Sequence, residues 1–324
     1  MNVNIKQKLV RLIKHVNNSK IQSNLLVERM GQTITRKEFE PNEAIVIAGS
    51  GRSGTTWIQN SLAEILRYQP IFEPLNPNFV NEAKLLLGVE QGGEPVVYSP
   101  YLRANGLYPE WDTLLTQALT GNIRNYWTEK KRYTLLPKGY ITKFIRANFM
   151  LGYISNNYNP KIIFVMRHPC AVIFSRMRLN WQANKSNLFY QPEIIEDYLR
   201  PYLSDIENEN DPVGIHAIWW ALEQLIALDE LKKQNYFFTH YEDILLSNKQ
   251  KLDEIIHWIG KNNQHKYFTQ RQEISISDDI ENKTRITQWV SGLNSDQKDK
   301  ILWWANRFDI NHYSNQIYPI NSSA

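Results

Sequence analysis

The sequence predicts an α/β protein in which helices flank a parallel β-sheet, with a helical insertion and a C-terminal cap segment. Short apolar runs typical of buried strands recur at 44–47, 140–146, 161–166 and 235–240. Stretches of helical character separate these runs, and strands that alternate with helices favour parallel pairing. A chain of 324 residues with 42% hydrophobic and 22% charged residues can bury one large core, so we expect a single domain over 1–324.

The N-terminal segment, 1–43, is predicted to be helical. The apolar residues that would share one side of its helix are Ile5, Leu9, Leu12, Ile13 and Val16. No stretch here or later in the chain is long and apolar enough for a signal peptide or a membrane span. A cytoplasmic protein is therefore the default expectation.

The region after the first strand and helix is irregular. Residues 68–79 are rich in proline, which predicts a loop. Residues 80–139 are aromatic, and we interpret them as an inserted helical lobe. This lobe is a candidate for a substrate pocket, and ordinary packing of its aromatic side chains is the equal alternative.

The C-terminal half alternates between strands and helices. A helix at 147–157 follows the strand at 140–146, and Pro169 is expected in the first turn of the helix that follows the strand at 161–166. The remaining predicted elements are helices at 193–208 and 214–233, a strand at 235–240, a helix ending near Gly260 and a last helix at 295–308. The polar stretch within 261–292 shows no clear period, so this segment is expected to form a mobile cap.

The segment 44–57 combines a buried strand with a turn that is suited to binding phosphate. The turn and the next helix start hold three glycines, one cation and two hydroxyls: Gly49, Gly51, Gly54, Arg52, Thr55 and Thr56. Backbone N–H groups of such a turn point inward, and the helix N-terminus adds about half a positive charge. A plain tight turn is the alternative, but a plain turn does not require this combination of residues.

The spacing is close to the nucleotide loop G-x-x-x-x-G-K-[ST], but Thr55 stands where that motif has its lysine. Because that lysine reaches the β- and γ-phosphates, its absence argues against a nucleoside triphosphate. The cation, Arg52, lies inside the loop instead. This placement suits a 5′-phosphate that carries a group to be transferred.

The stretch GRSGTTW resembles the 5′-phosphosulfate-binding loop of the sulfotransferases that use 3′-phosphoadenosine 5′-phosphosulfate (PAPS). The resemblance implies the sulfotransferase version of the P-loop NTPase-like fold and sulfuryl transfer from PAPS to a hydroxyl or amine. The loop residues that it assigns to the donor are Arg52, Ser53, Gly54, Thr55 and Thr56. It also implies that Arg52 steadies the oxygen that leaves the sulfur.

A second motif, RHPCAVIFSRM, places Arg167 at the end of one strand and Ser175 eight residues further on. It resembles the family's 3′-phosphate motif, and an arginine fork beside a hydroxyl is suited to a phosphate. An arginine paired with a carboxylate at the strand end is the alternative. His168 departs from the polar residue that many relatives have there, which leaves its surroundings undefined.

Two aromatic residues and a basic pair complete the predicted donor site. Tyr241, in the sequence HYED, resembles the family's tyrosine that lies against the adenine, and Trp57 matches a position that packs on the base. Core packing is the alternative for both residues. Lys283 and Arg285 loosely resemble the basic loop that closes over the 3′-phosphate, or they are solvated charges.

Sulfuryl transfer needs a general base, and the predicted base is Glu73. Cytosolic members of the family place a histidine just after the strand that corresponds to 140–146, where this chain has none. Other branches, including the tyrosyl-protein sulfotransferases, use a glutamate downstream of the first loop, and apolar neighbours would desolvate Glu73 there. A loop carboxylate paired with a lysine is the alternative. Lys143 and Arg146 either line the sulfonate or pair with carboxylates.

Composition and motifs restrict the other classes. A single cysteine, Cys170, excludes an internal disulfide and a cysteine-rich zinc site, and no metal is expected. A net charge of +4 suits an anionic small ligand and a small-molecule acceptor, and it is too weak to favour nucleic acid. Two alternatives remain open: a non-catalytic module that binds adenosine nucleotides, and a P-loop kinase or NTPase. The sequence leaves the oligomeric state open.

Overall fold

The computed structural model describes residues 39–87, 97, 99–131, 137–247, 250–261 and 276–320, except for the side chains of 276–283. Its five parallel strands form one sheet in the order β2-β3-β1-β4-β5. The strands are β1 (Ile45–Ala48), β2 (Gln69–Phe72), β3 (Tyr140–Phe144), β4 (Lys161–Met166) and β5 (Tyr236–His240). The predicted α/β class with a parallel sheet is confirmed.

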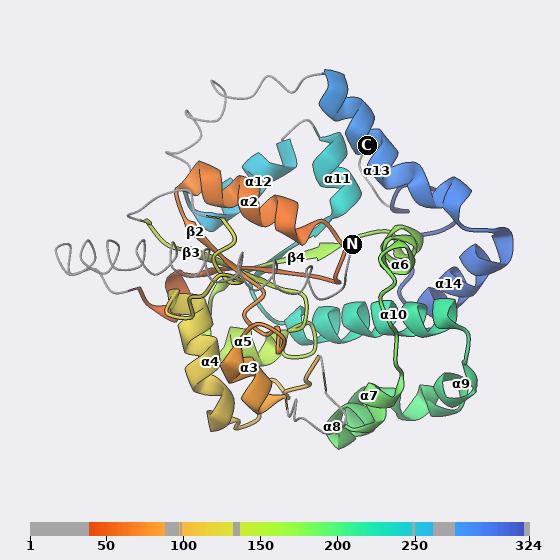
Figure 1. Cartoon of the computed structure of the whole chain (residues 1–324), viewed down its shortest axis with the longest axis horizontal. Helices are drawn as coiled ribbons and strands as arrows, with labels where there is room; N and C mark the ends of the chain where they lie inside the picture. The colour runs from red at the N-terminus through yellow and green to blue at the C-terminus, as the bar shows by residue number, and fades with distance from the viewer. Residues whose placement is uncertain are drawn as a thin grey trace, which may run out of the picture.

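Helices cover both faces of this sheet (Figure 1). On one face lie α2 (Thr55–Leu66), α11 (Tyr241–Leu246) and α12 (Gln250–Ile259). On the other lie α3 (Asn81–Leu86), α4 (Pro109–Thr120), α5 (Leu151–Tyr158) and the long α10 (Pro212–Leu231). Alternate residues of β1 enter the two layers, because successive strand side chains point to opposite faces. Ile45 and Ile47 join the core under α2 and α12, whereas Val46 and Ala48 join the core under α4 and α5.

A third group of helices packs against α10 at the side of the sheet (Figure 1). Its main members are α6 (Pro169–Arg178), α13 (Ile276–Gly292) and α14 (Ser295–Arg307). The shorter helices of the chain are η1 (Pro41–Glu43), α7 (Ser186–Phe189), α8 (Pro192–Ile194), η2 (Ile195–Leu199), η3 (Arg200–Tyr202) and α9 (Leu203–Asn208). The single helix predicted at 193–208 is therefore wrong. Pro201 has no N–H to continue an α-helical ladder, and the chain passes through a π-helical turn, η2, and a 3-10 turn, η3.

The edge strand β2 corrects the prediction of a loop at 68–79. Pro70 made a strand there seem unfavourable, because proline cannot donate to a ladder. The structure places β2 at the end of the sheet, where it pairs with β3 alone. At an edge the missing N–H is tolerated, so the proline does not prevent strand formation.

The described part of the aromatic insertion, 80–139, packs on the sheet. Ala83 of α3 and Trp111 and Leu115 of α4 belong to the same buried cluster as Ile71 of β2. The insertion is thus part of the layer that covers one face, and its role in binding an acceptor remains a prediction.

Two predicted segments lie partly outside the described residues. Of the N-terminal helical segment, residues 1–38 are not described, and neither are residues 262–275 of the predicted cap. From Ile276 onward the cap is a helix, α13, and its residues Ile286 and Trp289 are buried. Closure of this helix over the site remains a prediction. Within the described ranges, no helix is both long and apolar enough to cross a bilayer.

Candidate active site

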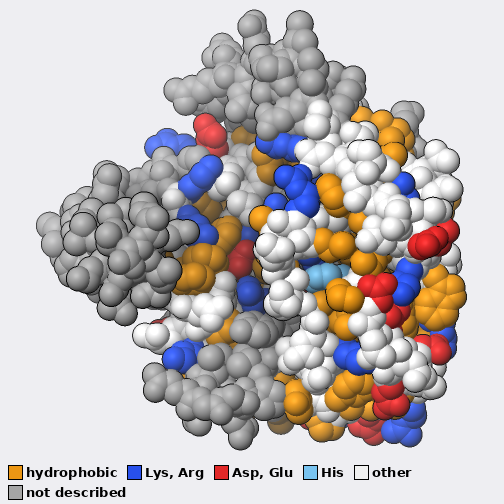
Figure 2. Space-filling model, turned by 45° about the vertical axis from the view of Figure 1, so that its right-hand side comes forward, with side chains coloured by type: hydrophobic (Ala, Val, Ile, Leu, Met, Phe, Trp, Pro, Cys, Tyr) orange, Lys and Arg blue, Asp and Glu red, His pale blue; other side chains and the backbone are white. Residues whose placement is uncertain are grey.

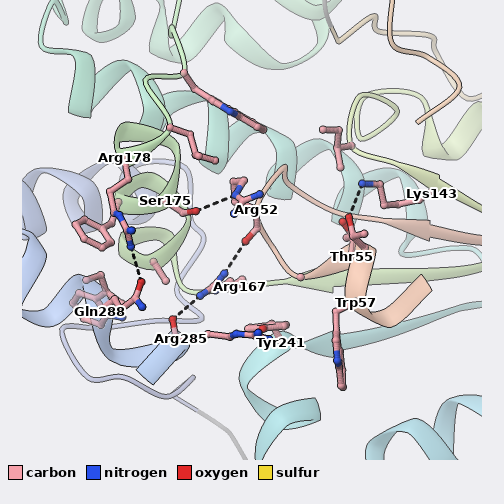
Figure 3. A pocket seen from close by; sticks show the side chains of 18 of the residues that line it. Arg52, Thr55, Trp57, Lys143, Arg167, Ser175, Arg178, Tyr241, Arg285 and Gln288 are labelled. Atoms are coloured by element: carbon pink, nitrogen blue, oxygen red, sulfur yellow. Dashed lines mark hydrogen bonds between the residues drawn. The ribbon is translucent and has the colours of Figure 1, made fainter. Parts of the chain in front are cut away.

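A cavity of about 540 Å³ lies at the carboxyl ends of the central strands. Arg52 follows β1, Lys143 is the penultimate residue of β3 and Arg167 follows β4, and all three line the cavity. Helices α6 and α13 form the opposite wall, as Figure 3 shows. Parallel sheets bind ligands at this end, because the loops that leave neighbouring strands meet there.

Two glycines allow the loop between β1 and α2 to approach its neighbours closely. Gly49 has a φ of +148°, and a Cβ there would lie 2.3 Å from the carbonyl oxygen of Val165. Gly54 has a φ of +82°, and a Cβ there would lie 2.1 Å from the ring of Tyr241. Only glycine fits either position. The loop is therefore pressed between β4 and Tyr241, and the first turn of α2 borders the cavity.

A buried polar network holds the back of this loop. Glu223 of α10 accepts hydrogen bonds from the hydroxyl of Ser50 (2.5 Å) and from Arg176 Nη2 of α6 (2.9 Å). Arg176 Nε also donates to the carbonyl oxygen of Gly51 at 3.3 Å. Gln224 Nε2 donates to the Ser50 hydroxyl at 2.7 Å. All four side chains are buried, so α6 and α10 together fix where the loop lies.

The two predicted anion-binding motifs meet in this one cavity. Arg52 Nε donates to the hydroxyl of Ser175 at 2.9 Å, and Arg167 Nη1 donates to the carbonyl oxygen of Arg52 at 2.9 Å (Figure 3). Partial burial, followed by the neighbouring charge of Arg167, lowers the pKa of Arg52. The two guanidinium groups are thus close enough to disfavour each other, and an anion between them would relieve this repulsion.

Arg167 also connects the loop between β1 and α2 to helix α13. Its Nη2 donates to the carbonyl oxygen of Arg285 in α13 at 2.9 Å, and its guanidinium carbon lies 4.6 Å from the ring centroid of Tyr241. Its Nε is buried and has no hydrogen-bond partner among the described residues. A buried donor without a partner beside a cavity fits an anionic oxygen such as that of a phosphate.

Glu73 lies on the opposite side of the cavity and is paired with two cations. Its Oε1 accepts from Lys143 Nζ at 2.7 Å and its Oε2 accepts from Arg146 Nη1 at 3.2 Å. Its backbone has a φ of +42°, and its carbonyl oxygen accepts from Trp127 Nε1 at 3.2 Å. A non-glycine residue in this left-handed conformation is unusual, and such strain persists where the surroundings hold it in place.

Lys143 connects Glu73 to the first turn of α2. Its Nζ donates to the hydroxyl of Thr56 at 2.8 Å and lies 3.8 Å from the ring centroid of Phe72. Burial lowers the pKa of Lys143 to about 8, although the carboxylate of Glu73 acts in the opposite direction. The ammonium group is therefore sensitive to pH just above neutrality.

The family model described as "Sulfotransferase domain" matches residues 42–312, which is most of the chain. The chain belongs to the sulfotransferase family. Membership supports sulfuryl transfer as the general activity of this sulfotransferase. No curated protein sequence matches it.

Two solved structures are similar to this sulfotransferase at low identity. One is the sulfotransferase domain from the Synechococcus PCC 7002 olefin synthase, with 19% identity over 83% of this chain and 95% of that chain, at a TM-score of 0.44. The other is the sulfotransferase domain from the curacin biosynthetic pathway, with 16% identity over 84% of this chain and 98% of that chain, at a TM-score of 0.45.

The structure of the sulfotransferase brings most of the predicted site residues together. Those that line the cavity are Arg52, Gly54, Thr55, Thr56, Trp57, Glu73, Arg167, Ser175, Tyr241 and Arg285. Ser53 is not among the described residues that line the cavity: its N–H donates to the carbonyl oxygen of Ser50 at 3.0 Å and its side chain is buried, so its role in holding the donor stays a prediction. The side chain of Lys283 lies outside the described residues.

Several site residues were not predicted. Arg178 and Gln288 line the cavity, and Arg178 Nη1 donates to Gln288 Oε1 at 2.9 Å (Figure 3). Arg178 comes three residues after Ser175, so helical spacing was a signal that both share one face of α6. No local pattern marked Glu223 or Arg176, because their partners are far away in the sequence.

His168 lies away from the cavity. Its Nδ1 accepts the N–H of Cys170, and its Nε2 lies within 3.0 Å of the carbonyl oxygens of Ser314 and Gln316. Burial lowers the pKa of His168 to about 4, so the imidazole is neutral. The histidine that stands here in place of the polar residue of many relatives thus packs against the C-terminal segment. Its neighbour Arg167 lines the cavity.

A second cavity, of about 790 Å³, adjoins the first. Ile145 and Trp181 line both cavities, and the buried pair Arg176 and Glu223 lines the second. Arg146 lines the second cavity and contacts Glu73, which lines the first. The ion pair between Glu73 and Arg146 therefore connects the lining of the first cavity to that of the second.

On the face seen in Figure 2, Lys and Arg side chains are interspersed with acidic and hydrophobic ones. No group of three or more His, Cys, Asp or Glu side chains that could hold a metal ion occurs in the part of the chain that the structure describes.

Proposed function

We propose that this sulfotransferase transfers a sulfuryl group from PAPS to a hydroxyl or amine of a small-molecule acceptor. One observation carries the proposal: among the described residues, the lining of the first cavity has five cations and a single carboxylate, Glu73. The cations are Arg52, Lys143, Arg167, Arg178 and Arg285. A donor with a phosphosulfate at one end and a phosphate at the other needs this excess of positive charge.

The two anion-binding motifs that line the cavity suit the two anionic groups of the donor. The first turn of α2 and Arg52 would hold the 5′-phosphosulfate, through Gly54, Thr55 and Thr56. The residues that would hold the 3′-phosphate are Arg167, Ser175, Arg178, Arg285 and, by its place in the sequence, Lys283. Trp57 and Tyr241 also line the cavity and would contact the adenine.

Glu73 is proposed as the general base because it lines the first cavity and contacts Arg146, which lines the second. The acceptor would enter through the second cavity and meet the sulfonate beside Glu73. A bond would form between the acceptor atom and sulfur while the bond from sulfur to the 5′-phosphate oxygen breaks. The acceptor proton would pass to the carboxylate, and Lys143 and Arg52 would stabilise the negative charge on the departing oxygen.

The ion pairs of Glu73 do not conflict with this role. Lys143 and Arg146 fix the two carboxylate oxygens in place, which is how a base is oriented before substrate arrives. The same pairs also suit a purely structural carboxylate. The effect of Glu73→Gln on turnover distinguishes a general base from a purely structural carboxylate.

Calorimetry and a transfer assay test the proposed function. We expect 3′-phosphoadenosine 5′-phosphate (PAP) to bind at least about tenfold more tightly than AMP, because AMP cannot use the 3′-phosphate site. Sulfur-labelled PAPS should then label an acceptor. Equal affinity for PAP and AMP would contradict the proposal. Binding of PAP without transfer to any acceptor would favour a binding module, and Mg²⁺-dependent ATP hydrolysis would favour an NTPase.

A further inference from the structure

The charged side chains that line the second cavity are paired with opposite charges. Arg176 and Glu223 are both buried and lie 2.9 Å apart, and Arg146 donates to Glu73. Burial, and then the charge of Arg176, lower the pKa of His216 to about 4, so this imidazole is neutral. An ionic acceptor would lose water in this cavity without a dedicated counter-charge, which is unfavourable.

Three aromatic residues line the second cavity: Trp181, Trp219 and Tyr190. Trp219 stacks on Phe149 at 5.9 Å with an interplanar angle of 11°, and its Nε1 donates to the carbonyl oxygen of Asn184 at 3.1 Å. Trp181 packs against Gly51 of the donor loop, since a Cβ at Gly51 would lie 2.9 Å from its ring. Rings that are fixed in this way present flat faces to a ligand.

Amides and hydroxyls supply the polar part of the lining. Four carboxamides, Asn78, Gln182, Asn184 and Asn187, surround the rings, and Ser99 and Ser186 add hydroxyls. Each carboxamide offers a donor and an acceptor side by side, which suits neighbouring hydroxyl groups of a ligand.

Aliphatic side chains are scarce in this cavity. Among the described lining residues, Ile145 and Ala183 are the only aliphatic ones. Ligand pockets are lined predominantly by hydrophobic and aromatic side chains, and in this cavity the aromatic ones supply most of that part. The lining thus suits a ligand that is polar at its edges and apolar on its flat face.

From this lining we infer that the acceptor is an uncharged glycoside, sulfated on one of its hydroxyl groups. The apolar face of a sugar ring would lie on Trp181 or Trp219, and its hydroxyls would meet the carboxamides. The acceptor oxygen gains the SO₃ group of the donor, whose bond to the 5′-phosphate breaks, and Glu73 takes the proton. The inference rests on the proposed function, because the second cavity faces a sulfonate only if the first holds the donor.

A panel of matched 4-nitrophenyl compounds tests this acceptor class. The protein, shown first to bind PAP, is given labelled PAPS with the β-glucoside, the glucosaminide, the glucuronide or 4-nitrophenol itself. These differ in charge or lack the sugar. We expect kcat/KM for the glucoside to exceed that for each other compound by about tenfold or more. Preference for the amine, the acid or the phenol, or transfer to none of the four, would overturn the inference and leave the donor assignment intact. Failure to bind PAP would overturn the proposed function and the inference with it.

A charge placed in the second cavity gives an independent test. Asn187→Asp adds a carboxylate to the lining, so the ratio of kcat/KM for the glucosaminide to that for the glucoside should rise about tenfold. Asn306→Asp is the matched control, because Asn306 is exposed on α14 and lines neither cavity. An unchanged ratio in Asn187→Asp, with PAP affinity retained, would show that the acceptor binds elsewhere.

Discussion

The hydroxyl of Ser50 donates a hydrogen bond of 2.5 Å to the carboxylate of Glu223, which lies 173 residues further along the chain. Both residues are buried, and the same carboxylate pairs with Arg176. The back of the loop that we propose to hold the phosphosulfate is therefore fixed to α10 and α6. Because Arg176 and Glu223 also line the second cavity, one buried pair borders both the donor loop and the proposed acceptor space.

Glu223→Gln removes the negative charge of this pair and keeps most of its shape. The buried guanidinium of Arg176 loses its counter-charge, so we expect the free energy of unfolding to fall by about 3 kcal/mol. Affinity for PAP should fall about tenfold, while affinity for adenosine 3′-monophosphate should hold, because that ligand does not use the loop. Calorimetry with both ligands, and denaturant unfolding, measure these effects. Glu207→Gln, at an exposed carboxylate on α9, is the control. An equal loss of affinity for both ligands would indicate a general structural role only.

Glu73→Gln should reduce turnover at least about a hundredfold while PAP still binds, because the amide cannot accept the proton. Lys143 and Arg146 lose their shared counter-charge in this variant, so affinity for the anionic PAP should not decrease. Single-turnover rates with saturating PAPS and PAP calorimetry give the two readouts. Near-normal turnover in Glu73→Gln would rule out this residue as the base.

Arg178→Ala tests the extension of the proposed 3′-phosphate site along α6. The change removes a cation one turn from Ser175, so affinity for PAP should fall about five- to tenfold while affinity for AMP stays the same. Calorimetry with PAP and AMP measures the difference. Arg200→Ala, at an exposed arginine that does not line the cavity, should change neither affinity. If Arg178→Ala weakened PAP and AMP equally, Arg178 would not recognise the 3′-phosphate.

Binding of PAP should depend on pH through Lys143. Its pKa of about 8 means that the ammonium is charged below pH 8 and becomes neutral as the pH rises above it. Attraction for an anionic ligand is therefore lost at higher pH, and we expect affinity to fall about tenfold between pH 7 and pH 9.5. A titration series at constant ionic strength measures this fall. In Lys143→Arg the guanidinium stays charged, so the same series should be nearly flat. If PAP affinity fell equally with pH in Lys143→Arg, a group other than Lys143 would be responsible for the pH dependence.

The donor site was largely predictable because its parts are local in sequence. The strand, loop and helix that contain Arg52 through Thr56 follow one another without interruption, and Arg167 and Ser175 lie within nine residues. Local patterns determine local structure, and the alternation of strands and helices then places both motifs at the same edge of a parallel sheet. The alternation of strands and helices was therefore enough to predict a parallel sheet and to predict that the two motifs lie close together.

The sequence by itself thus determined the sheet class, the strand, loop and helix that hold Arg52, and the family resemblance. Tertiary structure alone decided what surrounds them: the pairing of Glu73 with Lys143 and Arg146, the hold of Glu223 on Ser50, and the second cavity beside Trp181. These contacts join residues that are tens to hundreds of positions apart. Their geometry depends on how whole helices pack on the sheet, and no pattern within a short window of the chain encodes that packing.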